Sequence, residues 1–149
     1  MGFDLEGWLG AKGFAGVLAR DPRGLTPLMR ACLEGEPEAA RALIAAGAEL
    51  EARNGDGNTA VWLSCVEDRG EMIDLLAEAG AAIDSRNDGG VTALMYASSA
   101  GKAKAVARLL AAGADPKLET QDGFSALDMA ASLDCLNLLR ARARSMARG

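Results

Sequence analysis

The chain of 149 residues contains no histidine, and this absence excludes several kinds of active site. Catalytic triads and dyads whose base is an imidazole cannot form, and neither can zinc sites with histidine ligands. No pair of carboxylates stands out as an acid and base couple either. We therefore expect a protein that is not an enzyme and that has no catalytic residue, no cofactor and no metal ion.

Aromatic residues are also scarce, at 4%, although half of the residues are hydrophobic. This composition favours closely packed helices over a sandwich of β-sheets, whose core uses many aromatic side chains. No apolar stretch approaches the roughly 18 residues of a membrane span, and the first residues lack the features of a secretory signal. We expect a cytoplasmic protein that does not bind membranes.

Positive charge is sparse except at one end of the chain. The net charge is −5, and residues 34–88 hold 13 carboxylates and four arginines, whereas residues 140–149 hold four arginines and no acid. A nucleic-acid-binding protein needs an extended basic surface, so we expect no nucleic-acid partner. The acidic segment favours a partner protein with a basic surface. The arginine-rich end is typical of a solvated helix terminus, with a docking tail as the alternative.

The chain does have a repeat of 33 residues. Three features keep this period without an insertion: a hydroxyl residue, a glycine two positions before it, and a Gly-Ala pair in the other half of the unit. The hydroxyl residues are Thr26, Thr59, Thr92 and Ser125, the glycines are Gly24, Gly57, Gly90 and Gly123, and the pairs begin at Gly47, Gly80 and Gly113. A fixed period of this length indicates a stack of similar units.

Each unit reads as a turn followed by two helices. It opens with turn-forming residues such as Asn54-Gly55-Asp56-Gly57, in which a glycine can adopt a positive φ. The hydroxyl residue then caps a first helix, and the glycine of the Gly-Ala pair ends a second one. We expect the apolar positions of both helices to be buried, among them Leu28, Ala31, Leu43, Leu76, Leu94, Ala97, Leu109 and Leu127.

These units resemble ankyrin repeats. The family motif Thr-Pro-Leu-His-x-Ala appears as Thr26-Pro27-Leu28-Met29-Arg30-Ala31, and the family ending Leu-Leu-x-x-Gly-Ala-Asp matches residues 109–115 in full. The resemblance implies an all-α solenoid of stacked helix-turn-helix units with short finger turns. Its parts would be an N-terminal helical cap at residues 1–20, three repeats at 21–53, 54–86 and 87–119, and a C-terminal capping repeat with a basic tail at 120–149.

The departures from the family pattern predict local differences. Met29, Trp62, Met95 and Asp128 replace the family's histidine, so the hydrogen bonds that histidine makes between repeats must be absent, and packing should compensate in the first three repeats. Asp68 stands where the family has a glycine between the two helices. We therefore expect a turn of different shape there, and we expect repeat two to be the most irregular unit.

Residues 4–25 admit two arrangements. In the first, residues 4–20 form a pair of short helices with a turn between Gly10 and Gly13. In the second, Phe14-Ala15 takes the place of the Gly-Ala pair, and residues 15–25 form a finger loop.

We predict no disulfide among the three cysteines. Cys32 and Cys65 occupy the same place in adjacent repeats, where neighbouring helices pack about 8–10 Å apart. A disulfide requires Cα atoms within about 7 Å of each other. We expect these residues and Cys135 to be small packed side chains with free thiols.

The resemblance implies a non-catalytic module that binds a protein partner through a concave face of finger turns and first helices. In the register of this chain, the face comprises Arg23, Leu25, Asp56, Asn58, Asp88, Val91, Asp122 and Phe124 on the fingers and Leu33, Glu34, Val66 and Glu67 on the first helices. Leu25, Val91 and Phe124 are apolar at a turn position that we expect to project from the base of the finger rather than into the core. An alternative is an acidic accessory or inhibitory subunit that masks a nucleic-acid-binding or other basic protein. On its own the chain is expected to be a monomer.

Overall fold

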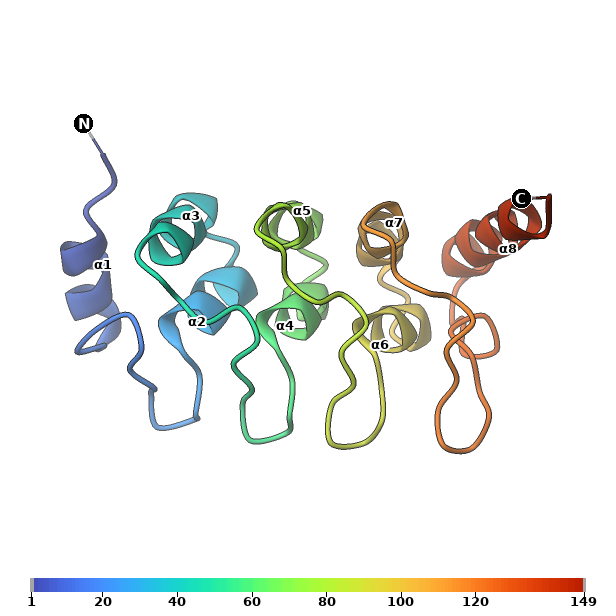
Figure 1. Ribbon diagram of the computed structural model, residues 1–149, viewed down its shortest axis with the longest axis horizontal. Helices are drawn as coiled ribbons and strands as arrows, with labels where there is room; N and C mark the ends of the chain where they lie inside the picture. The colour runs from blue at the N-terminus through green and yellow to red at the C-terminus, as the bar shows by residue number, and fades with distance from the viewer. Residues whose placement is uncertain (1, 149) are drawn as a thin grey trace.

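The computed structural model describes residues 2–148, and within them the chain forms a row of paired helices (Figure 1). The helices are α1 (Leu5–Lys12), α2 (Pro27–Glu34), α3 (Pro37–Ala45), α4 (Ala60–Val66), α5 (Gly70–Glu78), α6 (Ala93–Ser99), α7 (Ala103–Ala111) and α8 (Leu133–Arg148). Over the described residues, β pairing is limited to two isolated bridges, Arg86 with Thr92 and Glu119 with Ser125. The predicted all-α solenoid is confirmed.

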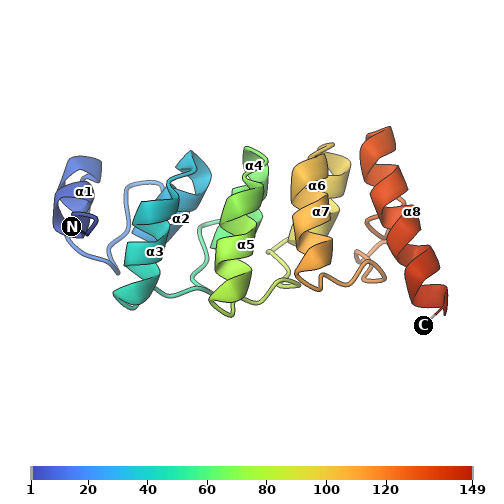
Figure 2. The same cartoon turned by 90° about the horizontal axis from the view of Figure 1, so that it is seen from above.

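The helices lie in two layers. Figure 1 shows the first helices of the units, α2, α4 and α6, in the layer nearer the finger loops, and the second helices, α3, α5, α7 and α8, in the other layer. All four finger loops, at residues 21–25, 54–58, 87–91 and 120–124, project to the same side. Seen from above, the pairs follow one another in a single row that ends at α8 (Figure 2).

A methionine sulfur takes part in the N-terminal cap of two of the first helices, α2 and α6. The Thr26 hydroxyl accepts a hydrogen bond from the Met29 N–H at 3.2 Å, and the Met29 sulfur accepts one from the Thr26 N–H at 3.4 Å. Thr92 and Met95 make the same reciprocal pair. Thr59 makes no side-chain cap. A residue in the histidine position therefore still forms a hydrogen bond in these two units, in addition to packing.

The apolar faces of the helices join into one core that runs along the row. Of the eight residues predicted to be buried, seven are at most 1% exposed, namely Leu28, Ala31, Leu43, Leu76, Leu94, Ala97 and Leu109. Leu127 is only half-buried, because residues 126–129 form a turn where the other units have a first helix. The most irregular unit is thus the fourth repeat and not the second, which corrects the sequence-based expectation.

Asp68 keeps the regular turn between the helices of repeat two, so the expected change of shape is wrong. Its φ of 56° is left-handed, like the 72° of Gly35 and the 71° of Gly101. The Arg69 N–H donates to the Ser64 carbonyl oxygen at 2.9 Å, as the corresponding N–H groups do in repeats one and three. The Asp68 carboxylate also accepts a hydrogen bond at 2.8 Å from the N–H of Ala105, in the first turn of α7. This aspartate therefore caps a helix of the next repeat, which offsets its backbone strain.

The N-terminal region contains one helix where the first arrangement expected two. The Phe14 N–H donates to the Leu9 carbonyl oxygen at 2.8 Å, which is the bond that Ala48 makes to Leu43 at the end of α3. Helix α1 therefore occupies the place of a second helix, and the chain after it leads into the first finger. This is the second arrangement, moved by one residue, since Gly13-Phe14 takes the place of the Gly-Ala pair.

Three arginines connect successive fingers. Arg20, Arg53 and Arg86 are 33 residues apart, and each donates one hydrogen bond to the glycine carbonyl four residues later in its own finger. The same nitrogen donates to the carbonyl oxygen of the residue 33 positions further on, which is the next arginine or, at the end, Glu119. These bonds hold each finger in register with its neighbours, and we refer to the three side chains as the arginine ladder.

The dual role of Asp68 predicts an order of stability among its variants. Asp68→Ala removes the bond to the Ala105 N–H and keeps a side chain in a left-handed conformation, so the free energy of unfolding should fall by about 1–3 kcal/mol. Asp68→Gly loses the same bond but relieves the backbone, and should be more stable than the alanine variant by about 1 kcal/mol. Urea denaturation of the two variants measures this difference, and equal losses would show that the backbone is not strained.

The cysteines are buried and free, as predicted. Burial raises the pKa of the Cys32 and Cys65 thiols to about 12, so neither is a thiolate near neutral pH. We expect a thiol reagent at pH 8 to titrate three cysteines in the denatured, unreduced protein and to react slowly with the native one. Rapid labelling of the native protein at Cys32 or Cys65 would contradict the packing described above.

Candidate protein-binding face

The residues at the finger bases do not form the exposed apolar row that the sequence suggested. Leu25 is 5% exposed and packs with Met29 and with Leu63 of the next repeat. Asn58 is also 5% exposed, and its side-chain oxygen accepts a hydrogen bond from the Asn87 amide at 2.9 Å. Both residues therefore belong to the interior between fingers and first helices, which corrects their assignment to the partner-binding face.

Phe124 differs from Leu25 because of its place in the row. A leucine at the base of the first finger is covered by α4 of the following repeat, whereas no repeat follows the fourth finger among residues 2–148. Phe124 is consequently 54% exposed, and Val91 is half-buried against the main core. At this position the fold buries either an apolar side chain, as at Leu25, or a hydrogen-bonded polar one, as at Asn58, contrary to the expectation that it projects from the finger base.

The charged finger residues lie on the surface. Asp56 and Asp88 are exposed on neighbouring fingers, and the Asp88 N–H donates to the Asp56 carbonyl oxygen at 3.1 Å. Asp122 and Arg23 are exposed on the last and first fingers. The predicted aspartates are therefore exposed along the fingers, with Arg23 at the N-terminal end of the row and the arginines of the ladder beside them.

The predicted first-helix residues come together at the ends of α2 and α4. Leu33 and Val66 are half-buried and pack on the small apolar cluster of Leu25, Met29 and Leu63. Their neighbours Glu34 and Glu67 are exposed. An apolar surface between two helices thus has a carboxylate next to it on each helix.

An aromatic pair extends this surface to the third repeat. The rings of Trp62 and Tyr96 have centroids 4.1 Å apart and an interplanar angle of 33°. Both side chains are half-buried, and the indole N–H of Trp62 has no hydrogen-bond partner. Burial raises the pKa of the Tyr96 hydroxyl, and Cys65 and Glu67 nearby raise it further. We call Leu33, Trp62, Val66 and Tyr96 the first-helix patch.

Sequence reasoning placed Trp62 in the helix packing and did not single out Tyr96. The two aromatic residues are 34 positions apart, one more than the repeat, so they do not occupy the same position of the unit. Their contact follows from the packing of α4 against α6. The available signal was the presence of two large aromatic side chains in consecutive first helices of a chain with few aromatics.

Glu34 is already paired, whereas Glu67 is not. Glu34 accepts hydrogen bonds from Lys12 at 2.7 Å and from Arg30 at 2.8 Å. Burial acts to raise the pKa of its carboxyl, but these two cations outweigh burial and lower the pKa to about 2. Glu67 forms no ion pair within residues 2–148. Of these two carboxylates, that of Glu67 is therefore the more available to a partner.

Over residues 2–148, no three carboxylate or cysteine side chains are grouped in a way that would hold a metal ion. No helix in the same range is both long enough and apolar enough to cross a membrane.

Comparison with known proteins agrees with the geometry. A model of ankyrin repeats in three copies matches residues 9–87, which is more than half of the chain, and a second model of ankyrin repeats in many copies matches residues 76–130. The chain belongs to the ankyrin repeat family. Members of this family are generally protein-interaction modules without catalytic activity.

A solved structure is similar to this ankyrin repeat chain over most of its length. The ankyrin repeat domain of Bcl-3, a member of the IkappaB protein family, superimposes with a TM-score of 0.78 at 28% sequence identity. The match covers 86% of this chain and 57% of the Bcl-3 chain, so the present chain spans little more than half of that domain. A search of the curated proteins found no significant match.

The different surroundings of Leu25 and Phe124 predict opposite effects of the same substitution. Leu25→Ala removes a buried side chain between two repeats and should lower the free energy of unfolding by about 2–5 kcal/mol. Phe124→Ala removes an exposed ring and should leave the melting temperature nearly unchanged. Thermal unfolding followed by circular dichroism distinguishes them, and a large loss for Phe124→Ala would place this ring in the C-terminal cap instead of on the surface.

Proposed function

We propose that this ankyrin repeat chain binds a partner protein on the face formed by its fingers and first helices. The partner presents a segment with both basic and apolar side chains. Its apolar side chains contact the first-helix patch, and its basic side chains face Glu67 and the finger aspartates Asp56 and Asp88, which are exposed.

The first-helix patch is the observation on which this proposal depends. It contains two of the larger apolar side chains of the chain, Trp62 and Tyr96, and neither is fully buried in the core. Tryptophan and tyrosine are enriched among residues that contribute most to binding energy. Completing their burial would stabilise a complex at little entropic cost, because the packing of the two rings already restricts their rotamers.

The charges around the patch favour a basic partner. Glu67 on α4 and the exposed aspartates of the second and third fingers are acidic, and residues 34–88 as a whole carry 13 carboxylates against four arginines. Exposed charges of this kind accelerate association and confer sensitivity to salt more than they increase affinity. Apolar burial at the first-helix patch supplies affinity for the partner, and the acidic residues around the patch favour a partner with a basic surface.

Charge reversal on the proposed face tests this function. Asp56→Lys combined with Glu67→Lys should abolish most of the recovery of the partner when the protein is used as bait in an extract of its own source and the captured proteins are quantified by mass spectrometry. The wild-type complex should also weaken as the salt concentration is raised from 50 to 500 mM, as expected for exposed charge pairs at roughly these ionic strengths.

A matched control variant distinguishes an effect at the proposed face from an effect of the net charge of the protein. Glu49→Lys combined with Glu78→Lys changes the charge by the same amount at exposed positions near the C-terminal ends of the second helices α3 and α5. This variant should recover the same partners as the wild type. Equal losses for both double variants would show that overall acidity, and not this face, holds the partner.

A further inference from the structure

The last helix of the chain continues past the point at which the other second helices end. In repeat three, Leu109 is followed four residues later by Gly113, whose φ of 95° takes the chain out of α7. Leu139 of α8 is buried like Leu109, but the residue four positions after it is Ala143, and the helix runs on to Arg148. Helix α8 is therefore 16 residues long, whereas α3, α5 and α7 have nine.

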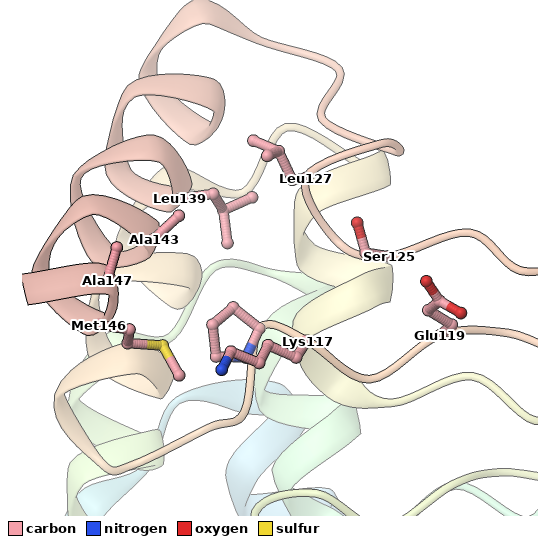
Figure 3. Close-up of a pocket in the computed structure, with 9 residues that line it drawn as sticks. Lys117, Glu119, Ser125, Leu127, Leu139, Ala143, Met146 and Ala147 are labelled. Atoms are coloured by element: carbon pink, nitrogen blue, oxygen red, sulfur yellow. The ribbon is translucent and has the colours of Figure 1, made fainter. Parts of the chain in front are cut away.

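The extension of α8 forms the apolar wall of a groove (Figure 3). The groove has a volume of about 430 Å³, and its other side is lined by Pro116, Lys117, Glu119, Ser125 and Leu127. Ala143, Met146 and Ala147 line it from the helix, and Met146 is 38% exposed. Leu127 reaches this groove because the first helix of the fourth repeat is reduced to a turn. We call this feature the α8 groove.

A basic ridge runs beside the groove. Residues four apart on a helix form a ridge, so Arg140, Arg144 and Arg148 lie next to the row of Leu139, Ala143 and Ala147. All three arginines are exposed, and none forms an ion pair within residues 2–148. Arg142 is different, because it donates a hydrogen bond to the Leu110 carbonyl oxygen.

The helix dipole does not account for the whole ridge. Its effect is limited to about the last turn of a helix, which includes Arg148. Arg140 is the eighth of the 16 residues of α8 and lies near the middle of the helix. The ridge therefore extends along the groove for two turns, and it is opposite in sign to the acidic face of the fingers.

We propose that the α8 groove is a second docking site, which binds an amphipathic helix with carboxylates beside its apolar face. Each second helix of the row packs against the next, α3 against α5, α5 against α7 and α7 against α8. A partner helix in the groove continues this series. Its apolar residues cover Met146 and Leu127, and its carboxylates, one per turn, pair with arginines that also recur about once per turn, every ~6 Å.

A protein helix fits this site better than a nucleic acid does. Most of the side chains that line the groove are apolar, none of them is an aromatic ring on which a base stacks, and the chain as a whole has a net charge of −5. An amphipathic helix uses both parts of the site, because apolar anchors at spacings of three and four residues enter the groove and the adjacent carboxylates meet the ridge.

A selection from random peptide sequences tests the proposal and does not require an identified partner. Phage-displayed peptides of 16 random residues are selected on the immobilised full-length protein. We expect enriched sequences with apolar residues three and four apart and with Asp or Glu beside them. The best synthetic peptide, measured by fluorescence anisotropy, should bind the Arg140→Glu/Arg144→Glu variant at least tenfold more weakly, and its Glu→Gln analogue should lose affinity to a similar degree.

Three further variants locate the binding. Met146→Glu places a charge in the groove and should also weaken the peptide at least tenfold. Arg23→Glu combined with Arg41→Glu makes the same change of charge at exposed positions far from α8 and should have no effect. Asp56→Lys combined with Glu67→Lys should have none either, so that a failure at the α8 groove is distinguishable from a failure at the first-helix patch.

Several outcomes would overturn the proposal. These are a selection without enrichment, enriched peptides without carboxylates, or peptides that bind the Arg140→Glu/Arg144→Glu variant as well as the wild type. Competition by a single-stranded oligonucleotide of equal charge would indicate a general polyanion surface instead. Self-association in light scattering that is lost with the arginine substitutions would make a second copy of the chain the occupant.

Discussion

The helix pairs of this chain bury their apolar faces only against neighbouring pairs, and the main features of the structure follow from that dependence. Residues in the interior of the row, such as Leu94 and Ala97, have a repeat on each side and are fully buried. In the last repeat the counterpart of Leu94, Leu127, is only half-buried, and Phe124 at the base of the last finger is exposed. Because stability in such a stack is a sum of units and the interfaces between them, exposed apolar surface gathers at the ends and along the first helices.

The backbone between helices is subject to a second constraint, which the side chains satisfy in different ways. A left-handed residue stands between the two helices of each of the first three repeats, and Gly35 and Gly101 supply it at no steric cost. Asp68 supplies it with a side chain that caps the next repeat. The arginine ladder acts similarly on the fingers, because each guanidinium satisfies carbonyl groups of two successive repeats. Regularity thus comes from bonds between units as well as from apolar packing.

The sequence predicted the periodic features well and the end-dependent ones poorly. The period of 33 residues was sufficient to predict the fold and seven of the buried residues, because each of these depends on a pattern that recurs in every unit. Leu25 and Phe124 share one position of the unit, and only the presence or absence of a following repeat separates a buried residue from an exposed one. The contact of Trp62 with Tyr96 and the bond from Ala105 to Asp68 cross between units at unequal positions, so a pattern within one unit contains no sign of them.

The distribution of charge is the part of the sequence that the fold leaves free. Packing determines the apolar positions and the arginine ladder takes Arg20, Arg53 and Arg86, but neither requires aspartates along the fingers or arginines along α8. Exposed acids and bases on one chain would attract each other if they were adjacent, and here most of them are kept apart.

The acids follow the middle repeats, and the basic ridge lies on the last helix beyond the fourth finger (Figure 1). The row of repeats keeps the two surfaces apart, because each unit contacts only its neighbours and α8 packs against α7. The two surfaces that we propose as binding sites therefore lie on different parts of the row.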